Sequence, residues 1–470
     1  MKTECNGTQL EFHGFGRRRV MARFDGGKLS SDGGGLLLRE VEQRCHVLKW
    51  LARCFVDHRE AERTEHSVEA LVKQRVMGLA LGYEDLNDHD VLRHDPLLAV
   101  LSNAPDPSGV TRKRPRDRGA ALAGKSTLNR LELTPASADA GCRYKKIVAD
   151  PEAMDRLLVE LFLEAYVEAP ASIIIDVDAT DDPLHGEQEG RFFHGYYREY
   201  CYLPLYFFCG EQLLCARLRT ADVDPAAGVI EELARMVGQI RARWPQTQII
   251  LRGDGGFCRD ALMSWCEAQP HVDFIVGMAK NHRLTARITV EMAAARAAHA
   301  RTGNAARVFK DFRYRTRDSW SCERRVIGKA EYLEGGENPR FIVTSLTAAD
   351  ARHLYEDVYC ARGEMENRIK EQQLMLFADR TSTHAIASNQ LRLYFSSFAY
   401  VLVQTLRRLG LQGTALAKAQ CSTIRLKLLK LGAQIRISVR RIVLAFSEGY
   451  PYAALFRQVL ARLRQIPIRA

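Results

Sequence analysis

Two apolar, β-branched runs that each end in an aspartate constrain the fold of this chain more than any other feature. Residues 172–177 read Ser-Ile-Ile-Ile-Asp-Val and are followed by Asp178, whereas residues 248–253 read Gln-Ile-Ile-Leu-Arg-Gly and are followed by Asp254. Such runs are typical of buried β-strands. An acid at the end of a buried strand is costly to desolvate, so it normally has a partner or a chemical role. Asp178 and Asp254 are therefore candidate catalytic residues.

The segments around these two runs predict a mixed α/β core. In chain order the elements are β-β-β-α-β-α-β, which is typical of a ribonuclease-H-like core in which a mixed sheet is flanked by helices. The two aspartates then follow the first and the fourth strand. The predicted strands are 172–177, 202–208, 212–218, 249–251 and 273–278, and the predicted helices are 225–244 and 259–268.

A third acid lies in a polar helical pattern over residues 351–374. Tyr359, Arg362 and Glu366 are spaced at i, i+3 and i+7, so they share one face of this helix. A solvated stripe is the alternative interpretation. The residue types favour function, because a carboxylate can bind metal while a guanidinium and a phenol can bind phosphate oxygens. Two strand-end aspartates and a helical glutamate can together hold divalent metal ions that act on phosphate esters.

Three other motifs in the sequence resemble known functional sites but lack the context that those sites require. Residues 176–180, Asp-Val-Asp-Ala-Thr, resemble a phosphatase nucleophile motif, but such a strand leads into a crossover helix, and here a strand, a tight turn and a strand follow. Residues 253–256 are glycine-rich but lack the Lys-Ser/Thr of a phosphate-binding loop. The acidic and His-rich stretch 83–95 has neither EF-hand nor zinc-helix spacing, which favours helix caps and turns.

The positive charge of the chain is concentrated near its end. The formal net charge is +11, and residues 401–470 contain 13 Lys and Arg but one acid, so the whole excess lies there. A second basic cluster, Arg-Lys-Arg-Pro-Arg-Asp-Arg, occupies residues 112–118. A solvated basic face is the alternative, but this distribution suggests a polyanionic partner, and double-stranded DNA is the one we expect.

The basic C-terminal region predicts a β-hairpin. Apolar residues alternate with basic ones over 424–428 and again over 435–440, on either side of Gly432. This period of two predicts one docked apolar face and one basic face; a helix with outward bases is the alternative. The residues expected to contact DNA phosphates are Arg425, Lys427, Arg436 and Arg440.

Composition excludes several other classes of protein. The longest uncharged run, 393–406, has 14 residues and is too short for a membrane span. The first residues lack an apolar signal segment, which predicts a cytoplasmic protein. The twelve cysteines form no CxxC pair, so we expect reduced, mostly buried thiols.

Several stretches together resemble the insertion-sequence-1380 family of bacterial DDE transposases. The match covers nearly the whole chain in order, and no single motif carries it. The stretches are FDGGKLSSDGGGLLLRE, GYEDLNDHDVLRHDPLL, DVDATDDPLHGEQEG, YLPLYFF, LRGDGGF, VGMAKNHRL and YxxRGEMENRIKEQQ.

The resemblance implies a cut-and-paste DNA transposase that cleaves the transposon ends and joins them to target DNA. It implies that Asp178, Asp254 and Glu366 hold two Mg²⁺ ions, or Mn²⁺, and that Arg362 and Tyr359 contact phosphates. The family's signature lysine would fall at Gln373; Lys370, one turn from Glu366, is the candidate instead. The resemblance also implies a homodimer in the DNA complex and a nucleoid-bound protein of the bacterial cytoplasm.

These inferences divide the chain into five expected regions. A largely helical DNA-binding or assembly domain comes first, the ribonuclease-H-like core is interrupted by a β-rich insertion, and a basic region ends the chain. The boundaries are 1–168 for the first domain, 169–283 and 340–410 for the two parts of the core, 284–339 for the insertion and 411–470 for the basic region.

Two side chains and two alternative functions complete the expectations. Trp320 is expected in the core of the insertion, with base stacking as the alternative. Asp176 is expected to point away from the ions or to support the site from outside. A ribonuclease-H-like nuclease without strand transfer and a DNA-binding protein with a decayed site remain the alternatives; the presence of all three acids argues against decay.

Overall fold

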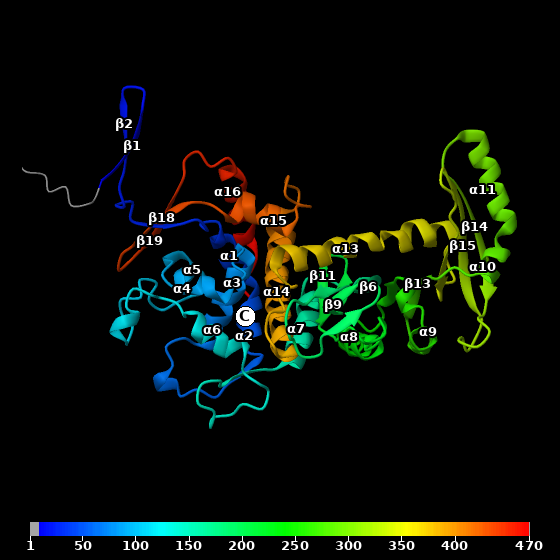
Figure 1. Ribbon diagram of the computed structural model, residues 1–470, viewed down its shortest axis with the longest axis horizontal. Coiled ribbons are helices and arrows are strands. Elements are labelled where there is room, and N and C mark those ends of the chain that lie inside the picture. Colours follow the sequence, from blue (N-terminus) through cyan, green and yellow to red (C-terminus); the bar gives the residue numbers. More distant parts are fainter. Residues whose placement is uncertain (1–8, 470) are drawn as a thin grey trace, which may run out of the picture. The chain divides into compact units, whose positions relative to one another are not determined.

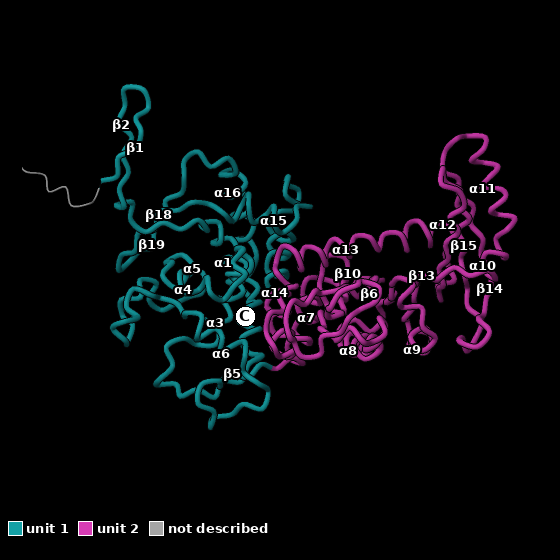
Figure 2. The backbone as a smooth tube through the Cα atoms, viewed as in Figure 1, with its two compact units in different colours: residues 1–149, 398–470 teal, residues 150–397 magenta. Residues whose placement is uncertain are grey.

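The computed structural model of the protein describes residues 9–469, which form two compact units (Figures 1 and 2). Of these residues, 9–149 and 398–469 belong to the first unit, and 150–397 form the second. The three predicted acids, Asp178, Asp254 and Glu366, all lie in the second unit. Helix α14 (Ile386–Leu406) begins in the second unit and ends in the first.

The second unit is built on a nine-stranded mixed sheet. Its order is β11-β10-β6-β12-β13-β17-β15-β14, with β16 paired to β15. The central strands β6, β12 and β13 are parallel, and the other neighbours are antiparallel. The strands are β6 (Ser172–Ala179), β10 (Leu205–Cys209), β11 (Gln212–Arg217), β12 (Gln248–Gly253), β13 (Val272–Met278), β14 (Ala306–Tyr314), β15 (Arg324–Leu333), β16 (Gly336–Glu337) and β17 (Arg340–Thr344).

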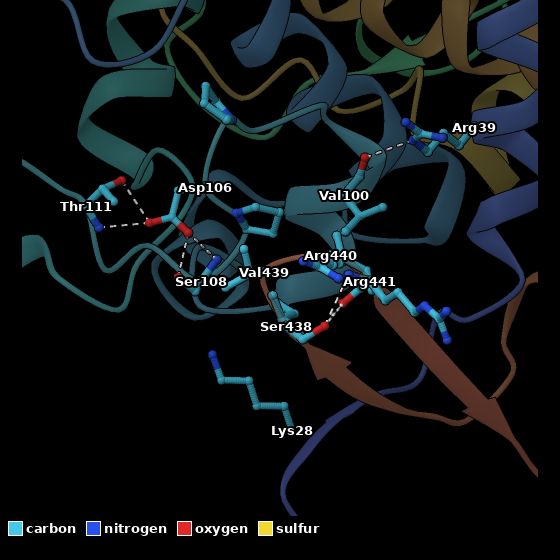
Figure 3. Close-up of a pocket in the computed structure, with 14 residues that line it drawn as sticks. Lys28, Arg39, Val100, Asp106, Ser108, Thr111, Ser438, Val439, Arg440 and Arg441 are labelled. Atoms are coloured by element: carbon cyan, nitrogen blue, oxygen red, sulfur yellow. Dashed lines mark hydrogen bonds between the residues drawn. The ribbon is translucent and has the colours of Figure 1, made fainter.

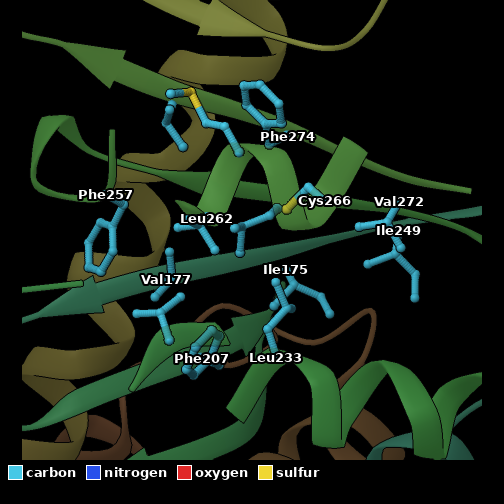
Figure 4. Packing of buried hydrophobic residues seen from close by; sticks show 14 of the residues in the cluster. Ile175, Val177, Phe207, Leu233, Ile249, Phe257, Leu262, Cys266, Val272 and Phe274 are labelled. Atoms are coloured by element: carbon cyan, nitrogen blue, oxygen red, sulfur yellow. The ribbon is translucent and has the colours of Figure 1, made fainter. Parts of the chain in front are cut away.

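The period of two within the strands separates an apolar face from a functional face. Ile175 and Val177 of β6 belong to the main buried cluster, in which residues of α7 (Pro151–Glu164), α8 (Val229–Arg243) and α9 (Asp260–Ala268) also lie (Figure 4). The alternate positions, Ile174 of β6 and Ile250 of β12, join a second cluster with Leu354 and Tyr355. The helical segment that carries Glu366 therefore covers the opposite face of the sheet.

That segment is continuous from 351 to 375 but is not uniformly α-helical. Helices α12 (Ala351–His353) and α13 (Gly363–Lys370) are joined by π-helical and 3₁₀ turns over 354–362, and a π-helical turn follows at Glu371–Met375. Such π-helical turns often occur at functional sites.

Two expected elements of this unit differ in the structure. The helix predicted from 225 begins at Val229, because Asp224 uses its side chain to accept from the Ala226 N–H and so holds a turn. The segment expected to be β-rich from 284 starts with α10 (His282–Arg287) and α11 (Thr289–Thr302). The alanine-rich run 293–300 favours a helix there, and strands β14 and β15 that follow extend the main sheet.

The first unit is mainly helical with small sheets. Strand β3 (Lys28–Ser30) pairs with β18 (Ala433–Ile437), which pairs with β19 (Ile442–Phe446), so segments more than 400 residues apart in the sequence share one sheet. Further strands are β1 (Leu10–Phe15), β2 (Arg18–Ala22), β4 (Phe55–Asp57) and β5 (Ile147–Ala149), and helices are α1 (Gly35–Cys45), α2 (Val47–Ala52), α3 (Val68–Leu81), α4 (His89–Leu92), α5 (Pro96–Leu101), α6 (Lys125–Glu132), α15 (Cys421–Ile424) and α16 (Ala453–Gln465).

Only one of the two strands expected in the C-terminal hairpin is present. Residues 421–429 are helical, because Ile424 and Leu428 are both buried at the i, i+4 spacing of a helix while Lys427 is exposed. The predicted strand over 435–437 is present, but it pairs with β19 rather than with 424–428. The hairpin therefore lies about ten residues further along the chain than expected.

Two further expectations can be compared with the structure. Within 9–469, no helix has the length and apolar character that crossing a bilayer requires. The cysteines of the same range are free thiols, and about half of them are buried.

Candidate active site

The structure brings the three predicted acids around one guanidinium. Arg362 Nη1 lies 3.2 Å from Asp178 Oδ2 and 3.4 Å from Glu366 Oε1, and its Nη2 lies 4.0 Å from Asp254 Oδ2. Asp178 is the last residue but one of β6, Asp254 directly follows β12, and Arg362 and Glu366 belong to the covering helical segment. Acids from two strands and one helix, up to 188 residues apart in sequence, thus share one partner.

Strand alternation explains why the two aspartates face the helix. Ile174, Asp176 and Asp178 lie on one side of β6, and Ile250, Arg252 and Asp254 follow the same alternation on β12. Because the isoleucines of this face pack under the helical segment, the acids at the strand ends lie beneath its next turns. The Tyr359, Arg362 and Glu366 spacing then aims those side chains back at the sheet.

The expectation that Asp176 points away is wrong, because two positions along a strand return to the same face. Asp176 is instead buried and paired with Arg252, whose Nη2 donates to Asp176 Oδ2 at 2.7 Å. Arg252 also donates to the carbonyl of Val358, next to Tyr359. This pair therefore connects β6 and β12 to the helical segment, next to the three acids. That is the supporting role expected for Asp176 as the alternative.

The charge state of Asp178 reflects its surroundings. Burial raises the pKa of Asp178 to about 6; Arg362 opposes this shift, whereas the charges of Asp254 and Glu366 add to it. Burial alone would lower the pKa of Arg362, but the charges of Asp178 and Asp254 raise it. The cluster is thus an acid-rich site held together by one permanent cation.

This pKa predicts a pH-dependent cost of ionising Asp178 without metal. A folded-state pKa near 6, against about 3.9 unfolded, means that the native state binds more protons between these values, so stability falls as pH rises from about 4 to 6. Asp178→Asn removes this term, so its stability advantage over wild type should grow by on the order of 1–3 kcal/mol across that window. Urea unfolding in EDTA at pH 4 to 7 measures it; a constant difference contradicts the assignment.

Tyr359 reaches the site because a glycine makes room for it. A Cβ atom on Gly277 of β13 would lie 2.5 Å from the Tyr359 hydroxyl and 2.8 Å from the Gly255 backbone nitrogen. Burial raises the pKa of Tyr359, and the charge of Asp254 adds to the shift while Arg362 opposes it. The sequence analysis did not identify Gly277. Its position near the end of β13, the strand that neighbours β12 and Asp254, could have indicated a residue that leaves space at the site.

A glutamine, Gln373, stands at the position where the family's signature has a lysine. Gln373 donates from Nε2 to the carbonyl oxygen of Asp181 at 2.9 Å, three residues beyond Asp178. Lys370 is exposed and has no ion pair within the described part of the chain. Gln373 thus binds backbone beside the site, and Lys370 is an exposed cation on the same helical segment.

The carboxylate oxygens of Asp178, Asp254 and Glu366 are the kind of donor that a hard divalent cation such as Mg²⁺ prefers. Among residues 9–469, however, no three His, Cys, Asp or Glu side chains lie together in a way that would hold a metal ion. In this structure the guanidinium of Arg362 lies among the three carboxylates instead, within 3.2 to 4.0 Å of one oxygen of each.

The other predicted DNA contacts belong to the first unit and do not all face solvent. Arg425 is turned inward and donates to the carbonyls of Ala80 at 2.9 Å and Leu79 at 3.3 Å, so its expected phosphate contact is wrong. Lys427, Arg436 and Arg440 are exposed. The helical turn at 425–429 accounts for the difference, because it points Arg425 toward α3.

The acidic and His-rich stretch 83–95 serves local structure, as the caps interpretation predicted. Asp85 and Asp88 form a reciprocal capping box at a 3₁₀ turn, and Asp95 caps α5 by accepting from the Leu97 and Leu98 N–H groups. His89 is buried in contact with Gln74. No metal role is needed to explain these residues.

Trp320 is a core residue. It is 5% exposed, packs edge-to-face on Tyr314 with ring centroids 5.9 Å apart, and belongs to the main cluster of the unit. Trp320→Ala should therefore lower the stability of the second unit by about 3–5 kcal/mol, which thermal unfolding would show. A well-folded variant that nicks DNA normally but stalls afterwards would instead indicate base stacking.

A mixed sheet with acids at the ends of two central strands, and a third acid from a covering helix, suits phosphoryl transfer on nucleic acid. The chain belongs to the DDE transposases: the family model described as Transposase DDE domain group 1 matches residues 12–468. It is therefore a DNA transposase, an enzyme that cleaves and transfers DNA strands.

No curated protein matches the chain. Among solved structures, the cryo-EM structure of a piggyBac transposase synaptic complex with hairpin DNA is similar at 10% sequence identity and a TM-score of 0.42, covering 92% of this chain and 84% of that chain.

Proposed function

We propose that Asp178, Asp254 and Glu366 are the catalytic triad of this transposase and hold two divalent cations, Mg²⁺ or Mn²⁺. The observation that carries this proposal is the convergence of all three carboxylates on Arg362. When bound, the ions would activate the attacking oxygen and stabilise the leaving 3′ oxygen.

The remaining residues of the site bind and orient the DNA strand. Arg362, released from the carboxylates, holds the scissile phosphate through its planar guanidinium. Tyr359 contacts a neighbouring phosphate from the space that Gly277 leaves open. The buried Asp176–Arg252 pair fixes the strand ends and the helical segment relative to one another, and Lys370 adds a cation on the exposed helix face.

We further propose a ribonuclease-H-like core and membership of the insertion-sequence-1380 group. The strand order β11-β10-β6-β12-β13, with β10 antiparallel and β12 and β13 parallel to β6, supports the core. The seven matching sequence stretches support the group. In this proposal the protein acts as a homodimer on two transposon ends at the nucleoid. The five functional regions of the chain end at residues 168, 283, 339, 410 and 470.

A supercoiled plasmid and a DNA fragment that carries a transposon end test the reaction. Joined products in the presence of Mg²⁺ are expected, because the freed 3′-OH attacks the target. Cleaved but unjoined products would indicate a nuclease without strand transfer. A mobility shift without cleavage would indicate a DNA-binding protein with a decayed site.

A further inference from the structure

A basic groove lies in the first unit, and none of the residues assigned above to catalysis lines it. It has a volume of about 1060 Å³ and is bounded by the loop 105–111, the turn between β18 and β19, and Lys28 at the start of β3 (Figure 3). The segments that line it are therefore far apart in the sequence. Of these residues, the sequence predicted DNA contact only for Arg440, in the turn between β18 and β19. It predicted none for the loop 105–111 or for Lys28.

The lining carries four positive charges and one negative charge. Lys28, Arg39, Arg440 and Arg441 supply the cations, and none of them has an ion pair within the described range. Arg39 donates to the carbonyl of Val100 at 3.1 Å, which fixes its position without neutralising it. The net formal charge of the lining is thus +3, which selects for a polyanion.

The single carboxylate of the lining is engaged by its own loop. Asp106 accepts from the N–H and hydroxyl of Ser108 and from the N–H and hydroxyl of Thr111, at distances from 2.5 to 2.9 Å (Figure 3). Burial alone would raise the pKa of Asp106, but these hydrogen bonds lower it. Its oxygens therefore shape the loop and oppose an incoming anion less than a free carboxylate would.

Close packing supports one wall of the groove, and a backbone hydrogen bond supports the other. Gly109 has φ +68°, and a Cβ atom there would lie 2.7 Å from the Ala121 backbone nitrogen, so the loop packs tightly on the chain behind it. In the opposite wall, Ser438 N–H donates to the Arg441 carbonyl at 2.8 Å and closes the turn. Arg440 and Arg441 are exposed on that turn.

We infer that this groove binds the sugar-phosphate backbone of duplex DNA. The inference rests on the DNA transposase function and adds a binding surface to it. A small anion would need convergent, buried donors, whereas Lys28, Arg440 and Arg441 are exposed, Arg39 is half-buried, and the four are spread over separate segments, as suits a DNA backbone. The exposed Arg114 and Arg118, just beyond the loop and without ion pairs in the described chain, extend the same charge.

Salt-dependent binding of the full-length protein to labelled duplexes tests the inference. Lys28→Ala/Arg440→Ala/Arg441→Ala should flatten the plot of log affinity against log salt by roughly 0.9 per lost contact, so by about 2–3 in all. Affinity for transposon-end and random duplexes should fall alike, because phosphate contacts carry no sequence information. Anisotropy titrations from 50 to 300 mM KCl measure both.

A matched control removes three exposed cations elsewhere in the unit: Lys418→Ala/Arg457→Ala/Arg464→Ala. This variant should keep the wild-type slope, and Arg440→Lys/Arg441→Lys should restore it by keeping the charge. If the folded triple variant of the groove keeps the wild-type slope while the wild type binds and nicks end DNA, then DNA does not bind at the groove. The transposase function would still stand. A wild type that binds no DNA would refute the function itself.

Discussion

Replacement of Asp178 or Asp254 by Asn, or of Glu366 by Gln, is expected to reduce strand cleavage by on the order of 1000-fold or more. Each amide is a poor ligand for Mg²⁺, and the three carboxylates are the oxygen donors that meet at Arg362. Binding of transposon-end DNA should change by less than about threefold, because phosphate contacts elsewhere provide most of the affinity. A nicking assay and a mobility-shift assay on the same samples measure the two effects.

Loss of folding is excluded in the same experiment. Asp178 is costly to ionise in its buried position, so Asp178→Asn should not lower the melting temperature near neutral pH. A neighbouring exposed acid on the same helical segment, Glu364, provides a matched control, and Glu364→Gln should keep wild-type cleavage. An Asp178→Asn variant that nicks at the wild-type rate while Asp176→Asn does not would show that the wrong aspartate was assigned.

Arg362→Ala is expected to have opposite effects on metal binding and on cleavage. The guanidinium lies between the carboxylates, 3.2 to 4.0 Å from their oxygens, so we expect it to compete with a cation for them. Its removal should tighten Mn²⁺ binding by about tenfold or more, a free-energy difference of about 1.4 kcal/mol. Cleavage should fall roughly 100-fold, because the scissile phosphate loses its guanidinium.

Electron paramagnetic resonance of free Mn²⁺ measures this binding without any reaction. Lys370→Ala is the matched control, because it removes a cation one turn from Glu366 that contacts none of the acids, and it should leave Mn²⁺ affinity unchanged. Adding Asp254→Asn to Arg362→Ala should abolish the gain. Equal Mn²⁺ affinities of wild type and Arg362→Ala would show that the guanidinium does not compete with metal.

If Arg362 does compete, DNA binding and metal loading are coupled. A phosphate offers the guanidinium another anion, so DNA at the site would draw Arg362 away and open the place between the carboxylates. Wild-type Mn²⁺ affinity should then rise when end DNA is present. Such coupling would limit metal-dependent cleavage to the DNA complex.

The candidate site could be predicted from local patterns, because its parts are set by periodicity. The β-branched runs identified the strands that position Asp178 and Asp254, and i, i+3, i+7 spacing placed Tyr359, Arg362 and Glu366 on one helix face. The central position of Arg362 could not be predicted, because spacing gives a face and not the distance between a helix and a sheet. The Asp176–Arg252 pair was missed for the related reason that pairing across parallel strands depends on register.

The errors arose where two periodicities compete in a short segment. Over 424–428, apolar residues alternate as in a strand, yet Ile424 and Leu428 also have helical spacing, and burial of both decides for the helix. Over 282–302, arginines and alanines gave no strong pattern, and the helices there pack into the main cluster through Leu284, Ile288 and Met292. Tertiary burial determined the first outcome, and the helix propensity of the alanines together with burial determined the second.

Iron-directed cleavage of the polypeptide tests the central claim most directly. Fe²⁺ that replaces Mg²⁺ at the site, with ascorbate and peroxide in the presence of end DNA, generates radicals that cut the nearby backbone. Simultaneous cuts near Asp178, Asp254 and Glu366 are predicted, together with their loss in Asp178→Asn and their suppression by excess Mg²⁺. Cuts elsewhere, or the same three cuts in Asp178→Asn, would contradict a metal site formed by these three carboxylates.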